Sequence, residues 1–281
     1  MYTLKNDLVF KNVFFKDLNK LKWLLDGIFS LQGISNIEIY NISNNELGKD
    51  RLYIKNKVVD SIIDTNYAYI NMELNDKFNE YKKIRNFFYQ TSYLNSLVHV
   101  NGDYACLEKP IIQINLNIKN KIENELLNKY SINNSITYNE YLNIFYIINI
   151  NIDKMLDKWY NELNQDINYF NKYKYVLILG MDEDELMNLE VEDKMINEIK
   201  DEVITLNRRP EFYQVISREE DNRMMMKTSL IEGEQAGMKV GLEKGRRENI
   251  DETARKMKEE KLSFELISRI TGLDINTIKN L

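Results

Sequence analysis

Three carboxylates lie close together in one short stretch of the chain, VVDSIIDTNYAYINMELN, which spans residues 58–75. The stretch alternates like a β-hairpin, and a turn is expected at Asn66-Tyr67 because Asn tolerates a positive φ. That turn places Asp60 directly opposite Glu73, with Cβ atoms about 5 Å apart. Two ionised carboxylates at this distance repel each other unless a cation lies between them. The pair therefore suits a divalent metal ion held by oxygen ligands.

The other polar residues of the hairpin have different predicted roles. Asp64 lies nearer the turn, roughly 13 Å from Asp60 at about 3.3 Å per residue, and is interpreted as a turn residue. Glu73 and Asn75 share one face of their strand, opposite the face of Ile70 and Met72. A solvated strand face with alternating polar residues is the open alternative, because one acid pair followed by an Asn is a weak signal.

The residue types of the whole chain narrow the chemistry further. The 281 residues carry a formal net charge of −6, so contact with nucleic acid would require a local basic patch. One cysteine, Cys106, and one histidine, His99, exclude a disulfide framework, a Cys-rich zinc site and a multi-His metal centre. Catalysis would then rest on Asp, Glu, Lys, Ser, Tyr or a carboxylate-bound ion such as Mg²⁺ or Mn²⁺. The abundant Asn is interpreted as codon bias rather than as a functional signal.

The elements that must position these residues follow from hydrophobic periodicity. Helices are predicted over 5–33 and 80–100, and strands over 35–42, 51–64, 67–75 and 108–118. The order α-β-β-β-α-β, with a helix between the third and fourth strands, predicts an α/β fold whose sheet contains a crossover. Further along, strands are predicted over 141–152 and 173–180, and a helix with an acidic first turn over 182–207.

The segment after Arg208 is charged and predicted to be helical. Glycine recurs every four residues, at Gly233, Gly237, Gly241 and Gly245, which indicates either close helix–helix approach or a marginal linker helix. The last residues have the pattern of two short helices with a bend at Gly272-Leu273, as in a helix-turn-helix. No apolar run reaches the ~18 residues needed to span a bilayer and no signal peptide is present, so we expect a cytoplasmic protein.

Several motifs, taken in order, resemble those of one family. The first helix carries Lys5, Asn6, Asp7, Phe10 and Lys11, and the strand Asp60 precedes INMELN. The next helix carries Arg85 and Tyr89, and a passage with Gly102, Asp103, Tyr104, Leu107, Pro110 and Ile111 follows. Residues 3–118 thereby resemble the recombination-promoting nucleases, also described as a transposase family, within the PD-(D/E)XK nuclease superfamily. The glycine-rich tail is similar to that of such proteins as well, whereas residues 120–205 match loosely.

The resemblance implies a restriction-endonuclease-like core and a Mg²⁺-dependent DNA endonuclease, with Mn²⁺ as an alternative ion, active in recombination or mobile-element biology. It implies Asp60, Glu73 and the backbone carbonyl of Leu74 as metal ligands, and Asn75 as the third catalytic position. That position is Gln in this branch and Lys in many relatives. Asn is one methylene shorter than Gln and carries no charge, although it can hydrogen-bond a water or a phosphate oxygen.

The DNA itself would be contacted by Lys82, Lys83 and Arg85 at the start of the following helix, unless these form an ordinary solvated face. We expect a nuclease-like domain over 1–205, a helical linker over 206–250 and a helical hairpin over 251–281. A homodimer or other homo-oligomer without membrane contact is expected. The alternative function is a catalytically impaired DNA-binding, regulatory or oligomerising relative that kept the fold.

Overall fold

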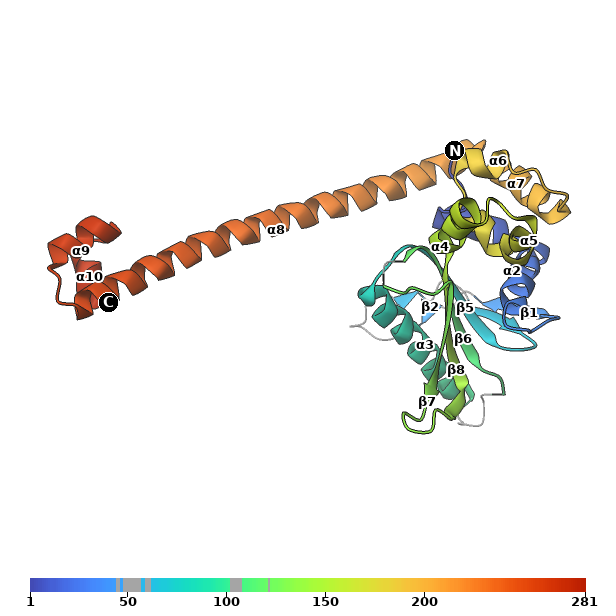
Figure 1. The fold of residues 1–281 in the computed structure, drawn as a ribbon, viewed down its shortest axis with the longest axis horizontal. Coiled ribbons are helices and arrows are strands. Elements are labelled where there is room, and N and C mark those ends of the chain that lie inside the picture. Colours follow the sequence, from blue (N-terminus) through green and yellow to red (C-terminus); the bar gives the residue numbers. More distant parts are fainter. Residues whose placement is uncertain (44–45, 48–56, 59–61, 102–107, 121) are drawn as a thin grey trace. The chain divides into compact units, whose positions relative to one another are not determined.

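The computed structural model describes residues 1–43, 46–47, 57–58, 62–101, 108–120 and 122–281. The chain divides into two compact units, Met1–Phe212 and Tyr213–Leu281. The first unit contains a six-stranded mixed sheet flanked by helices, and the second unit is helical (Figure 1). The α/β class predicted from the sequence is therefore confirmed, together with the helical C-terminal region. Among the residues described, no helix is both long enough and apolar enough to cross a membrane.

The elements follow one another in a mixed order. They are α1 (Asp7–Phe14), α2 (Leu18–Ser30), β1 (Ile39–Ser43), β2 (Glu46–Leu47), β3 (Lys57–Val58), β4 (Ile62–Thr65), β5 (Tyr69–Phe78), α3 (Glu80–Asn101), β6 (Ile111–Asn120), β7 (Leu127–Asn133), β8 (Glu140–Asn151), α4 (Ile152–Asp157), α5 (Ile167–Leu177), α6 (Glu183–Met187), α7 (Lys194–Asn207), α8 (Pro210–Glu259), α9 (Phe264–Thr271) and α10 (Ile275–Asn280).

The six-stranded sheet has the order β1-β4-β5-β6-β8-β7. Its three central strands, β5, β6 and β8, are parallel, and the strands on either side pair antiparallel. Because β5 and β6 are parallel, the chain must cross over between them, and α3 makes that crossover as predicted. In Figure 1, α3 runs along the strands, while α2, α4 and α5 gather at the end of the sheet away from the β7–β8 turn.

The β4–β5 hairpin has the predicted register. Ile62 pairs with Asn71, Ile63 with Ile70 and Asp64 with Tyr69. The turn lies at Asn66-Tyr67, but Asn66 does not have the expected positive φ. The side chain of Thr65 instead accepts from the Ala68 amide at 2.9 Å and donates to its carbonyl at 2.7 Å, which closes the turn.

Asp64 was predicted to be a turn residue, and this is wrong. It lies in β4 opposite Tyr69, and its carboxylate forms an ion pair with Lys109, the residue that precedes Pro110 at the start of β6. Lys109 also donates to the Thr65 carbonyl at 2.5 Å. Asp64 therefore ties the hairpin to the neighbouring strand.

Three other predictions about elements need correction. The helix expected over 5–33 is two helices, because Asp17 caps a new start at α2 by accepting from Asn19 N at 2.9 Å. The segment 173–180 is not a strand: it forms the last turns of α5 and a 3₁₀ turn over Ile178–Gly180. The helix expected over 182–207 is α6 and α7, separated where Asp193 caps α7. Strand β7 was not predicted.

The second unit has a small apolar core. Ala254, Ile267 and Ile278, one residue each from α8, α9 and α10, are fully buried together. Gly272 ends α9 in the left-handed region at φ +75°, a conformation that glycine adopts at low cost. The predicted bend between two short helices is therefore confirmed.

Candidate functional site on the polar face of the sheet

One face of the three central strands is polar although it is buried. Side chains alternate along a strand, so Asn71, Glu73 and Asn75 of β5 share a face. The parallel register aligns them with the same face of β6 and β8, forming the rows Asn71–Gln113, Glu73–Asn115–Asn149 and Asn75–Asn117–Asn151. All eight side chains are buried. A polar group buried without a hydrogen bond costs about 1–3 kcal/mol. Most polar atoms of these rows are hydrogen-bonded, but Asn71 Oδ1, Asn75 Oδ1, Asn117 Nδ2 and Asn151 Oδ1 have no hydrogen-bond partner among the described residues.

Helix α3 covers this face and supplies many of its partners. Asn79 caps the start of α3, since its side chain accepts from the Lys82 amide at 3.0 Å. From there the helix turns Asn86 and Gln90 toward the sheet, where both are buried. Asn86 donates to Asn115 Oδ1 at 2.6 Å, and Gln90 donates to the Tyr146 carbonyl at 3.0 Å.

Glu73 forms an ion pair with Arg85 of α3, whose Nη2 lies 3.1 Å from Glu73 Oε2. The Glu73 side chain is 9% exposed, whereas that of Arg85 is 40% exposed and lies 5.5 Å from the centroid of the Tyr89 ring. The carboxylate is thus held in a partly dry environment by a cation that reaches it from the solvent side. Asp60, its predicted partner, lies outside the described residues, as do Cys106 and the motif residues 102–107.

Asn75 lies on the same face as Glu73, as predicted, and its side chain is fully buried. Its Nδ2 donates to Asn117 Oδ1 at 3.1 Å, while its Oδ1 accepts no hydrogen bond within the described part of the chain. The side chain of Leu74 lies on the opposite, apolar face. Only the backbone of Leu74 can therefore join a site beside Glu73.

These donors fit the metal ion that the resemblance implies. The Glu73 carboxylate and the Asn75 amide oxygen are hard oxygen donors, the type that Mg²⁺ and Mn²⁺ prefer. The described residues contain no cluster of three or more Asp, Glu, His or Cys side chains arranged to hold a metal ion. The resemblance implies two carboxylate ligands, Asp60 and Glu73. Of these, Glu73 is the one that lies within the described residues.

The basic residues expected to contact DNA do not all face outward. Arg85 is directed to Glu73, and Lys83 Nζ lies 3.6 Å from both Glu80 and Glu123. Lys82 lies one residue before Lys83 in the first turn of α3 and is half-buried. Two of the three cations are therefore engaged with carboxylates of the molecule itself.

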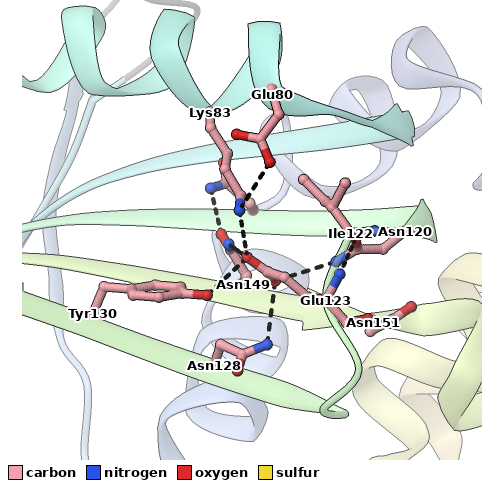
Figure 2. Close-up of polar contacts among 10 residues, drawn as sticks. Glu80, Lys83, Asn120, Ile122, Glu123, Asn128, Tyr130, Asn149 and Asn151 are labelled. Carbon is pink, nitrogen blue, oxygen red and sulfur yellow. Dashed lines mark hydrogen bonds and ion pairs between the residues drawn. The ribbon is translucent and has the colours of Figure 1, made fainter.

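A second buried carboxylate, Glu123, lies beyond the end of β6 on the same face (Figure 2). Its Oε1 accepts from Asn149 at 2.7 Å and from the Tyr130 hydroxyl at 2.9 Å. Its Oε2 accepts from Asn120 and Asn128, both at 3.2 Å. The turn itself directs Glu123 inward, because Asn120 Oδ1 accepts from the Glu123 amide. Burial and the bond to Glu123 raise the pKa of Tyr130 to about 12.

A continuous chain of hydrogen bonds connects the two carboxylates. Arg85, which is paired with Glu73, donates to Asn86 at 3.2 Å, and Asn86 donates to Asn115. Asn115 donates to Asn149 at 2.7 Å, and Asn149 donates to Glu123. The chain spans α3, β6 and β8 and ends on a carboxylate that accepts four hydrogen bonds. Such a chain fixes the rotamers of its members and thereby the position of Arg85 beside Glu73.

Sequence reasoning missed Glu123 and the amide rows. A signal was present, because Gln113, Asn115 and Asn117 recur every second residue in IIQINLNI, and Asn149 and Asn151 recur likewise in YIININI. A larger cavity, of about 1090 Å³, lies between α2, α5 and α7, but its lysines are paired, Lys22 with Asp26 and Lys174 with Asp193. The chemistry is concentrated on the polar sheet face instead.

Comparison with known proteins gives no relative for this chain: no family model, no curated protein and no solved structure matches it.

Proposed function

We propose that the protein is a Mg²⁺-dependent DNA endonuclease with a restriction-endonuclease-like core, active in recombination or mobile-element biology. The observation that carries the proposal is the register of the β4–β5 hairpin. The prediction that Asp60 lies opposite Glu73 assumes this register, and all three described residue pairs of the hairpin have it. The buried Glu73 carboxylate supports an oxygen-ligand site, as does the Asn75 oxygen, which accepts no hydrogen bond from the described residues.

The ion would lower the pKa of a bound water and neutralise charge on the scissile phosphate. Glu73 would bind the ion together with Asp60 and the Leu74 carbonyl. Arg85 holds Glu73 by an ion pair and is fixed in turn by the amide chain, so the carboxylate is preorganised for binding. Asn75 can hydrogen-bond a water or a phosphate oxygen but cannot act as a base.

Cleavage of supercoiled plasmid tests the proposal. Wild-type protein is expected to nick or linearise the plasmid with Mg²⁺ or Mn²⁺ and to be inactive in EDTA. Glu73→Gln and Asp60→Ala should reduce the rate by more than about 100-fold, because even outer-shell changes at metal sites cost 10–100-fold. Asp64→Asn is the matched control: it removes a carboxylate of the same hairpin that is committed to Lys109, and should cleave normally. Equal cleavage by wild type and Glu73→Gln would identify a contaminant and refute the proposal.

One observation favours a second candidate, a DNA-binding relative without catalysis. Asn75 is fully buried and its amide is bonded to Asn117, so the third catalytic position carries neither a base nor a charge. In that case Mn²⁺ titration would show no binding, while DNA would still bind with an affinity that falls steeply with salt. A homodimer or other homo-oligomer remains a prediction from the sequence, and light scattering tests it.

A further inference from the structure

A cavity of about 360 Å³ lies between α3 and strands β6, β7 and β8, on the polar face of the sheet. Its walls are apolar and include Ile84 and Phe87 of α3, Tyr130 of β7 and Ile147 of β8. Its floor is formed by Asn115 and Asn149. The volume is at the lower end of the range for small-molecule pockets, which suits one compact group rather than an extended ligand.

Two aromatic rings of this cavity are held in place although they are half exposed. Phe87 is 48% exposed and packs edge-on against Phe145, with 5.8 Å between the ring centroids. Tyr130 is 43% exposed, and its hydroxyl is fixed by the bond to Glu123. A rigid aromatic surface that is already partly exposed offers stacking area at little cost in conformational entropy.

The floor of the cavity has little hydrogen-bonding capacity to offer. Asn115 and Asn149 are buried, and their amides bond to each other and to neighbours on the same face. Asn115 Oδ1 already accepts from both Asn86 and Gln113. A planar group that enters the cavity would therefore be bound mainly by stacking and apolar contact. The floor would form few hydrogen bonds to the polar edge of that group.

The cavity lies beside the proposed metal-binding residue. Asn115 pairs with Glu73 in the parallel register, and Asn149 pairs with Asn115. Since neighbouring strands are about 4.8 Å apart, the floor lies roughly 5–10 Å from the Glu73 backbone. Lys83 lines the same cavity, and its side chain, held toward Glu123, is 34% exposed. The aromatic rings of the cavity, the partly exposed Lys83 and the nearby Glu73 carboxylate thus lie in one region of the polar face.

We propose that this cavity receives one unpaired nucleobase of a DNA strand, beside the phosphate at the proposed cleavage site. The proposal rests on the proposed function for its biological meaning and specifies its substrate class: DNA with single-stranded or extruded nucleotides. Aromatic stacking accepts every base, because each base has a π-face. The floor amides are already bonded to each other and to neighbours on this face, so binding should depend little on the base sequence.

Fluorescence anisotropy in EDTA tests this proposal separately from cleavage. The probes are labelled oligo-dT and oligo-dA of about 15 nucleotides, the upper range of single-strand site sizes, and a duplex of the same length. Wild-type protein should bind both single strands with similar affinity and more tightly than the duplex. Phe87→Ala should weaken single-strand binding by roughly 5- to 150-fold, the cost of one lost stacking contact.

Ile132→Ala is the matched control, because Ile132 is a 44% exposed residue of β7 that does not line the cavity, and it should bind as wild type. If Phe87→Ala fails to fold by circular dichroism, Ile84→Glu perturbs the same cavity from a 55% exposed rim position and should weaken binding likewise. Tighter binding of the duplex, or unchanged affinity in a folded Phe87→Ala or Ile84→Glu, would overturn the proposal. A protein that binds single strands normally but never cleaves would refute the nuclease function and leave the cavity assignment standing.

Discussion

Glu123 shows how single residues organise the polar face of the sheet. A carboxylate taken out of water needs several donors, and Glu123 has four within the described part of the chain, with Lys83 slightly further away. These donors come from the end of β6, from β7, from β8 and from α3. Loss of this one carboxylate would therefore release side chains of several elements at once.

The ionisation of Tyr130 reports directly on Glu123. Burial first, and then the hydrogen bond and the negative charge of Glu123, raise the pKa of Tyr130 to about 12 from its usual 10.0. Glu123→Gln removes the charge and weakens the bond, so the pKa of Tyr130 should fall toward 10.0 without reaching it. Carbon NMR of labelled tyrosine measures this. Tyr169, whose pKa is raised to about 12 by burial and by Tyr173, is the internal control. An unchanged Tyr130 pKa would contradict the geometry.

The sequence allowed part of this site to be predicted. Glu73 and Asn75 could be placed on one face because strand alternation is a local property, and the register followed from a short turn. The amide rows could not be placed, because they depend on parallel pairing between strands 34 to 42 residues apart. The polar residues of each strand could be recognised in the sequence. The order of the strands in the sheet could not be predicted from it. The abundance of Asn also concealed its two-residue period on β6 and β8.

At the scale of elements, predictions failed where tertiary packing decides the local structure. Residues 173–180 have the aromatic and β-branched composition of a strand, yet they complete α5 and a 3₁₀ turn. Asp166 caps α5 by accepting from the Tyr169 amide at 2.7 Å, and Tyr175 packs against Trp23 of α2 with 4.6 Å between ring centroids. The contact with α2 depends on the helical conformation of these residues. Its partner, Trp23, lies far outside the eight-residue segment from which the strand was predicted.

Gly27 of α2 makes this contact possible. A Cβ at Gly27 would lie 2.0 Å from Tyr175 Cγ, whereas nothing lies within 4 Å of a Cβ at Gly237 in α8. Gly27→Ala should therefore destabilise the first unit by about 1–3 kcal/mol or more through overpacking. Gly237→Ala, the matched control, should stabilise α8 by about 1 kcal/mol because alanine is the better helix former. Thermal unfolding followed by circular dichroism distinguishes them, and a neutral Gly27→Ala would refute the close α2–α5 packing.

At the scale of the whole molecule, the two units differ in how they are stabilised. The first unit has apolar strands and helices that bury many large side chains, including Phe10, Phe14, Phe29 and Phe170. The second unit buries three apolar side chains where α8, α9 and α10 meet, while most of α8 between residues 224 and 250 is exposed. The segment that forms this core, residues 251–281, is 31 residues long, and domains below about 40 residues rarely fold without additional support.

The polar sheet face belongs entirely to the first unit, so that unit should carry both proposed activities alone. A chain truncated after Arg223, which keeps the fully buried Ile216, should keep its principal unfolding midpoint within about 2 °C of the full-length value, a shift of at most about 1 kcal/mol for a domain of this size. It should also retain single-strand binding and Mg²⁺-dependent cleavage. Calorimetry of both chains, together with the plasmid and anisotropy assays, checks this. A truncated chain that folds normally but loses DNA affinity would instead assign part of the DNA contact to residues 224–281. A chain that fails to fold would show that α8 supports the first unit beyond Arg223.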